Sequence, residues 1–152
     1  RFEKANIDHD GWDTHQRNFN ILRDHRLPVF DQAYSALCQD LDSRGMLEDT
    51  VVAVLSEFGR TPKINSKPGG GRDHWSRAYT AVVAGGGTAA GRVVGRTTPD
   101  GGDVRETPIS PKDMQATLYH LLGYDSQMTM PDRNGQPPPI AGTGSLRPEL
   151  LS

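Results

Sequence analysis

The run TVVAVLS at residues 50–56 constrains the fold of this chain most. It is filled by β-branched and aliphatic residues without polar alternation, which is typical of a strand buried on both faces of a parallel sheet. A second such run, AYTAVVAGGG at 78–87, ends in three glycines, and GRVVGRT at 91–97 is consistent with a short third strand. Together with helical segments before and after them, these runs predict an α/β architecture.

Two segments show helical periodicity. Apolar residues recur at helical spacing over 18–41, and Pro28 inside this run is expected to break or kink it near the first turn of its second part. Gly45 is the predicted C-cap of this segment. A second helix is predicted between an N-cap at Ser110 and a stop at Gly123.

Composition indicates one folded domain over residues 1–152 with long connections. Only 34% of residues are hydrophobic, while 17 glycines and 11 prolines favour loops, and a proline-rich extended tail is expected over 125–152. The net charge of -2 gives no basis for nucleic-acid binding. No apolar run approaches the roughly 20 residues of a transmembrane segment, and the single Cys38 excludes an intrachain disulfide.

Three polar clusters lie beside the predicted elements: DHDGWDTH at 8–15, SEFGR at 56–60 and GGGRDHW at 69–75. Ligands converge beyond the carboxyl ends of strands in open α/β sheets, so we expect the clusters to meet there. Carboxylates and imidazoles are ligands for divalent metal ions, and arginines suit a bidentate hold on an anion. The candidate metal ligands are Asp13, His15, Glu57, Asp73 and His74, and the candidate substrate-binding residues are Arg60 and Arg72.

Simpler interpretations remain open for each cluster. Asp13 and Thr14 could cap a helix that starts nearby. Glu57 could be an ion-pair partner of Arg60, and the glycine-rich loop 69–75 could be an exposed turn.

The whole pattern resembles a known family. The motifs GWDTH, RGMLEDTVVAVLSEFGRTPKIN, GRDHW, VVAGGGTAAGRVVGRT, TPISPKDMQATLYHLLGYD and DRNGQPPPIAGTGSLRPELL occur in the order seen in DUF1501, a bacterial family abundant in planctomycetes. That family is placed in the alkaline-phosphatase-like superfamily with sulfatases, phosphopentomutases and cofactor-independent phosphoglycerate mutases. The resemblance implies the C-terminal part of a doubly wound sheet flanked by helices, with the nucleophile outside this chain.

The resemblance also implies roles for individual residues. GWDTH is similar to the segment that supplies an Asp and a His to one metal, here Asp13 and His15, although the superfamily more often spaces this pair four apart. TVVAVLSEFG at 50–59 is similar to the strand that usually ends in an adjacent Asp and His for a second metal, where this chain has Glu57 and Phe58. Phe58 cannot ligate a metal. GRDHW is similar to the segment with a late His, here His74.

The implied function is a metal-dependent hydrolase or transferase acting on phosphate or sulfate esters. A divalent Zn, Mn, Ca or Mg ion is expected, with Asp73 as an additional ligand or as the hydrogen-bond partner of a His. The expected substrate is a small anionic ester or a sulfated or phosphorylated glycan, steadied by Arg60 or Arg72.

The alternative function is a catalytically inactive metal- or glycan-binding module, which the Phe58 departure favours. Family members often begin with a twin-arginine export signal, so the resemblance implies a periplasmic or extracellular location. A third expectation is that a sheet lacking its other strands exposes strand edges.

Overall fold

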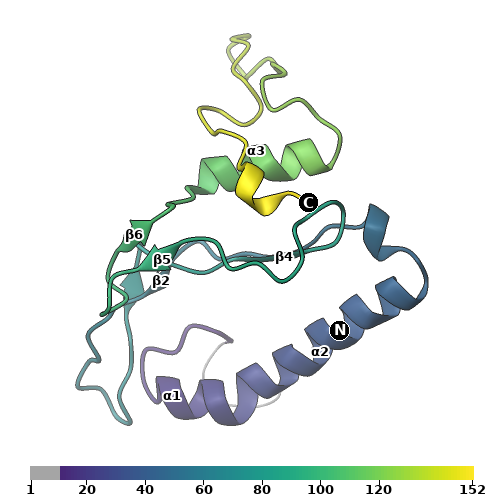
Figure 1. The fold of residues 1–152 in the computed structure, drawn as a ribbon. Helices are drawn as coiled ribbons and strands as arrows, with labels where there is room; N and C mark the ends of the chain where they lie inside the picture. The colour runs from purple at the N-terminus through teal and green to yellow at the C-terminus, as the bar shows by residue number, and fades with distance from the viewer. Residues whose placement is uncertain (1–10) are drawn as a thin grey trace.

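The computed structural model describes residues 11–152 and has helices on both sides of a thin layer of strands (Figure 1). Helix α2 lies on one side of the strands and α3 on the other. The chain is therefore of mixed α/β class. Its elements are α1 (Asn18–Ile21), the π-helical turn η1 (Leu22–Arg26), α2 (Leu27–Ser43), the 3₁₀ turn η2 (Leu47–Asp49), β1 (Val52–Val54), β2 (Gly59–Arg60), β3 (His74–Trp75), β4 (Val82–Ala84), β5 (Arg96–Thr97), β6 (Val104–Glu106), α3 (Pro111–Leu121) and the 3₁₀ turn η3 (Pro148–Leu150).

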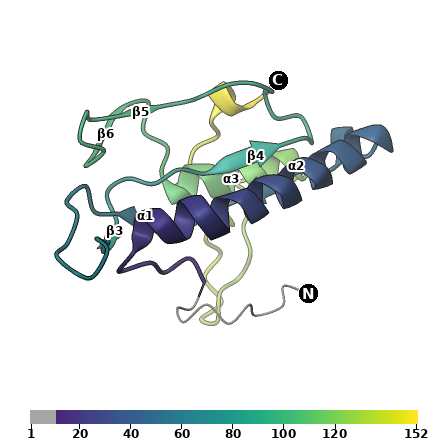
Figure 2. The same ribbon diagram turned by 90° about the horizontal axis from the view of Figure 1, so that it is seen from below.

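The first helical segment continues through Pro28 without a break. Figure 2 shows α1, η1 and α2 as one long rod, with Pro28 in the first turn of α2. The wider π turn lets the N–H of Leu27 reach the carbonyl of Leu22. Proline lacks an N–H and its ring crowds the preceding turn, so a local widening is a physically reasonable way to admit it. The sequence predicted a break or kink at Pro28, and the structure has a π-helical turn before it and no break.

Gly45 ends α2 as predicted. It adopts the left-handed conformation at φ 66. Its N–H donates to the carbonyl of Asp42, and the N–H of Met46 donates to that of Leu41. This pair of bonds is the Schellman motif, which satisfies carbonyls that the helix end leaves free.

The strands pair differently from the prediction. β1 and β4 form an antiparallel pair with Ala53 opposite Val83, and β2–β3 and β5–β6 are also antiparallel pairs. Parallel neighbours need a crossover connection, usually a helix. Here the connection from β1 to β4 doubles back through β2 and β3, so β4 returns in the opposite direction. The expected parallel sheet is therefore not seen in residues 11–152.

The strands are also less buried than predicted. Ala53 is exposed in the middle of β1, and Val82 of β4 is 40% exposed. The accessible surface is 11014 Å², whereas a compact monomer of 16.6 kDa exposes about 7,600 Å². The buried apolar residues of the described chain are Ile21, Ala78, Ala116 and Ala141. Several large apolar side chains of α2 and the strands are therefore exposed, among them Val29, Leu37 and Val82.

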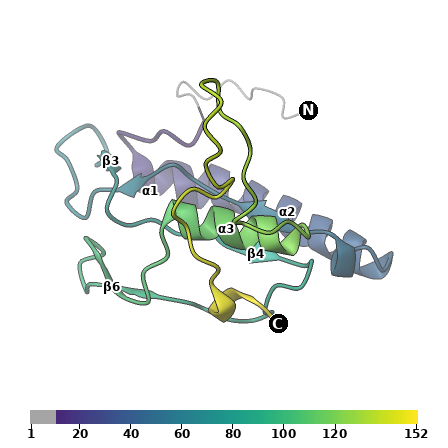
Figure 3. The ribbon, with the colours of Figure 1, turned by 90° about the horizontal axis from the view of Figure 1, so that it is seen from above.

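Helix α3 begins at the predicted N-cap Ser110, which forms a capping box with Asp113, and it anchors the C-terminal segment. The Ser110 hydroxyl accepts a hydrogen bond from the N–H of Asp113, and the Asp113 carboxylate accepts one from the N–H of Ser110. The same carboxylate accepts a bond from the N–H of Ser145 at 2.9 Å. Gly123 follows the helix at φ 82, as its predicted role requires. Figure 3 shows the C-terminal segment returning over α3.

We expect Asp113→Ala to lower the Tm, because the N–H groups of Ser110 and Ser145 would lose their acceptor. The free energy of unfolding should fall by about 1 kcal/mol. Hydrogen bonds from the N–H groups of Ser145 and Ser110 hold the pKa of Asp113 below its ordinary value. Its stabilising effect is therefore present above the ordinary carboxyl pKa and is lost as the pH falls through the lower folded-state pKa. Thermal melts between about pH 2 and 6 should show the Tm gap between wild type and variant closing in acid.

The exposed Asp31 of α2 offers a matched control, and Asp31→Ala should leave the Tm nearly unchanged throughout this range. A gap for Asp113→Ala that is the same at every pH would contradict the assigned role of its carboxylate.

No helix within residues 11–152 has both the length and the apolar character needed to cross a membrane.

Candidate metal centre

Two segments far apart in the sequence come together beside the start of α1. The N–H groups of Arg17 and Asn18 donate to the carbonyls of Pro68 and Gly70, both at 3.0 Å. These bonds hold residues 11–17 against the glycine-rich loop. Figures 2 and 3 both place β3, which follows this loop, next to α1. The pairing of β2 with β3 then sets Arg60 opposite His74.

Three predicted ligands converge at this junction. Asp13 Oδ1 lies 2.8 Å from His74 Nε2 and 3.1 Å from His15 Nε2. The two Nε2 atoms are 3.1 Å apart. Three atoms from three side chains therefore form a small, nearly equilateral triangle, which we call the triad (Asp13, His15 and His74).

The donor chemistry and spacing of the triad fit a divalent metal ion. Two imidazole nitrogens and one carboxylate oxygen are ligands typical of zinc and other transition metals. Ligand atoms about 2.0–2.1 Å from one ion stand about 2.8–3.4 Å from each other, between adjacent octahedral positions at the lower end and tetrahedral positions at the upper end. The triad needs little movement to reach this spacing. Three protein ligands would leave coordination positions open, as catalytic sites do.

Asp73 lies behind His15 and outside the triad. Its Oδ1 is 2.7 Å from His15 Nδ1. A carboxylate can only accept here, so Nδ1 carries the proton and Nε2 presents its lone pair to the triad. Asn65 Nδ2 donates to both Asp73 oxygens at 3.3 Å, and Lys67 Nζ lies 3.5 Å away. The hydrogen bond from His15, followed by that from Asn65, keeps the pKa of Asp73 below its ordinary value.

Arg60 binds Asp13, the carboxylate member of the triad. Its Nη2 donates to Asp13 Oδ1 at 2.7 Å and to the carbonyl of Trp12 at 3.0 Å, while Nη1 donates to the carbonyl of Arg72 at 3.2 Å. The hydrogen bonds from His74 and then Arg60 lower the pKa of Asp13 to about 2. Arg60 thus positions Asp13, and the ion pair with Glu57 that the sequence left open as an alternative is not formed.

Two predicted site residues lie apart from the triad. Glu57 is exposed and is not part of the ligand group. The Arg72 guanidinium lies over the ring of Phe19, 5.4 Å from its centroid, in a cation–π contact. Asp8, His9 and Asp10 of the first polar cluster fall outside the described residues.

The helix-cap interpretation of Asp13 and Thr14 does not hold. The N-cap of α1 is Arg17, and no side chain caps this helix end. The Thr14 hydroxyl bonds instead to Asn18 Oδ1 at 2.5 Å. Asp13 therefore does not cap the helix, and its carboxylate contacts the two histidines of the triad.

Sequence reasoning missed Asn65 and Lys67. Asn65 also donates to the carbonyl of His15 at 3.0 Å and accepts from the N–H of Gly71 at 3.0 Å. It thereby joins the two segments that carry the triad. An Asn in a polar loop carries no pattern that distinguishes this role from an ordinary turn, so only the fold reveals it.

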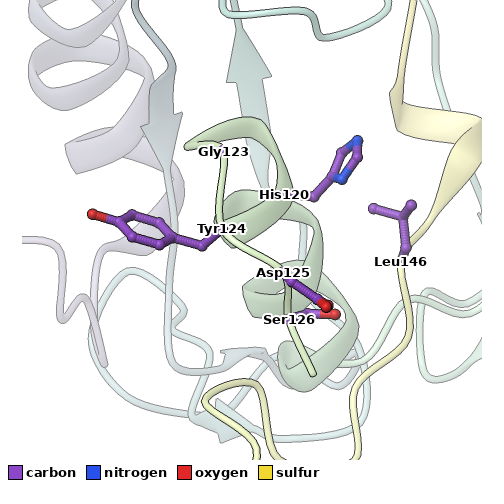
Figure 4. A pocket seen from close by; sticks show the side chains of 6 residues that line it. All are labelled: His120, Gly123, Tyr124, Asp125, Ser126 and Leu146. Atoms are coloured by element: carbon purple, nitrogen blue, oxygen red, sulfur yellow. The ribbon is translucent and has the colours of Figure 1, made fainter. Parts of the chain in front are cut away.

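The structure also contains a cavity of about 400 Å³ at the C-terminal end of α3 (Figure 4). Its lining residues are His120, Gly123, Tyr124, Asp125, Ser126 and Leu146. Figure 4 shows the Tyr124 ring directed away from His120. None of these residues belongs to the triad, so this cavity is separate from the candidate metal centre.

We expect Asp73→Asn to weaken metal binding about 10-fold and Asp73→Ala about 100-fold, the range found for outer partners of ligating histidines. Asparagine keeps an acceptor oxygen near His15 Nδ1 but loses the charge, whereas alanine loses both. Calorimetric titration with Zn²⁺ measures the two affinities. Ser76→Ala, at an exposed position of the same segment, should bind as wild type does. Equal affinities for all three variants would contradict the role of Asp73.

Fold and site together define a mixed α/β protein with a surface-exposed candidate metal centre. Within that class the particular family is clear: a model described as "Protein of unknown function (DUF1501)" matches residues 2–151, so the chain belongs to the DUF1501 family. Neither a curated protein nor a solved structure matches the chain.

Proposed function

We propose that the triad binds a divalent metal ion and that the protein is a metal-dependent hydrolase or transferase of phosphate or sulfate esters. The observation that carries the proposal is the convergence of Asp13 Oδ1, His15 Nε2 and His74 Nε2 within 3.1 Å of one another. The doubly wound alkaline-phosphatase-like architecture, an exported location and a nucleophile supplied from outside this chain are parts of the same proposal. They rest on the resemblance of the sequence motifs.

The openness of the triad supports a catalytic role over a purely structural one. The side chains of Asp13, His15 and His74 are 53%, 32% and 47% exposed, so a substrate can reach the open coordination positions. A bound divalent ion supplies Lewis-acid polarisation of an ester oxygen. The chain's own residues orient the ligands: Asp73 sets the tautomer of His15, and Arg60 fixes Asp13.

The positive charge available to an anionic substrate comes from Lys67. Its side chain is 51% exposed, and its Nζ lies 3.5 Å from Oδ1 of Asp73, the carboxylate bonded to His15. Arg60 and Arg72, the predicted anion-binding residues, are engaged with Asp13 and Phe19 respectively. Lys67, rather than Arg60 or Arg72, is therefore the residue that we propose binds the anionic substrate.

The test is a turnover assay of the intact protein loaded in turn with Zn²⁺, Mn²⁺, Ca²⁺ and Mg²⁺, using aryl phosphate and aryl sulfate esters. We expect metal-dependent hydrolysis that His15→Ala abolishes and that His25→Ala, at an exposed position of η1, retains. Metal binding without hydrolysis of either ester class would refute the enzymatic proposal.

One observation favours a second function, a catalytically inactive metal- or glycan-binding module. Phe58 packs against His74 at the place where the resemblance implies a His for a second metal ion, and Glu57 beside it stays outside the triad. If this function is correct, the metal ion raises the Tm and a sulfated glycan binds, without ester turnover. An unsulfated glycan of the same backbone is the matched control.

A further inference from the structure

Phe58 lies against the triad because of the register of β2 and β3. Arg60 pairs directly with His74. Phe58 immediately precedes β2, two residues before Arg60. Side chains two residues apart on extended backbone point to the same side, which makes Phe58 the diagonal neighbour of His74. The two rings are stacked, with centroids 4.0 Å apart and an interplanar angle of 27°.

The two histidines of the triad are held in different ways. His15 is fixed at both ring nitrogens, with Nδ1 bonded to Asp73 and Nε2 facing the triad. Within residues 11–152, the side-chain hydrogen bonds of His74 all involve Nε2, and its Nδ1 has no protein partner. A ligating imidazole normally has a partner on its second nitrogen that fixes its orientation. At His74 no residue in the described part of the chain supplies that partner.

The ring of Phe58 supplies the missing constraint. Stacking between aromatic rings is attractive, and here it covers one face of the imidazole. Rotation of His74 away from the triad would break the stack and leave Phe58 uncovered. His74 is 47% exposed, so little other packing restrains it.

We propose that Phe58 is a positioning residue that holds the His74 imidazole toward the metal ion by stacking, in place of the hydrogen bond that orients His15. This inference rests on the proposed metal binding by the triad. It gives a role to Phe58, which stands where the family resemblance implies a metal-binding His.

The test compares Phe58→Leu and Phe58→Tyr in the intact protein. Leucine keeps apolar volume and loses the stack, so we expect Zn²⁺ affinity to fall on the order of 10-fold, as for other outer partners of a ligand. Tyrosine keeps the stack and should restore wild-type affinity. Loading with Co²⁺ gives a visible absorption spectrum that reports ligand geometry, and it should change in Phe58→Leu alone. Tyr124→Leu, a half-exposed aromatic outside the triad, is the matched control.

The outcomes separate this inference from the proposed function. If wild-type protein binds no metal, the proposed function and this inference both fail. If wild type binds metal and Phe58→Leu keeps its affinity and Co²⁺ spectrum, only the positioning role is overturned. A lower Tm for Phe58→Leu with unchanged affinity and spectrum shows ordinary packing and also overturns it.

Discussion

Replacing His74 by alanine should reduce divalent-metal affinity by more than about 100-fold, beyond the range expected for outer partners of a ligand. His74 Nε2 lies 2.8 Å from Asp13 Oδ1 and 3.1 Å from His15 Nε2, so its loss leaves two ligands and a half-exposed site. Two ligands cannot define the coordination geometry that three provide. Asp13→Asn should also weaken binding, because it removes the negative charge.

Metal content of the purified protein and calorimetric titration measure this loss. His120→Ala is the matched control, because His120 is exposed on α3 and lines the separate cavity. It should keep wild-type metal content. If both His74→Ala and Asp13→Asn keep the metal content of the wild type, the triad is not the metal-binding site.

Replacing Gly71 by alanine should destabilise the protein by about 1–3 kcal/mol and weaken metal binding at least about 10-fold. Gly71 is buried, and an added Cβ would overlap the carbonyl of His15. That carbonyl belongs to backbone, so it cannot move aside as a flexible side chain would. The glycine loop and the segment with Asp13 and His15 would have to separate.

Separation of these segments would also strain the bonds of Asn65, which connect Gly71 to His15. Chemical denaturation measures the stability change, and titration with Zn²⁺ measures the affinity. Gly135→Ala is the control: at φ 75 it carries backbone strain, but its added Cβ meets no atom within 4 Å. It should cost about 1 kcal/mol and leave metal binding unchanged. Wild-type affinity in Gly71→Ala would contradict the close approach as a determinant of the site.

Local sequence patterns predicted the ends of the helices well. The N-cap at Ser110 and the stops at Gly45 and Gly123 all appear in the structure. Each depends on hydrogen bonds between residues only a few positions apart, so the information lies within one short segment. Donor chemistry likewise identified Asp13, His15 and His74 before their proximity was known, because carboxylates and imidazoles are the usual ligands of these metals.

Strand pairing was predicted less well. A run such as 50–56 indicates a strand and its apolar character, but the direction of its partner depends on the path of the chain between the two strands. The segment between Val54 and Val82 turns back through β2 and β3, which makes the pair antiparallel. Nothing in the run itself specifies that path.

The sequence by itself determined the helix boundaries and the set of candidate metal ligands, because local hydrogen bonding and side-chain chemistry decide both. Only the tertiary structure decided which of these candidates lie close enough together to bind one ion. Contacts across about 60 positions bring Asp13 and His15 to His74, place Asp73 behind His15, and leave Glu57 outside. These contacts depend on which segments pack together, and Phe58 became part of the site only through the register of β2 and β3.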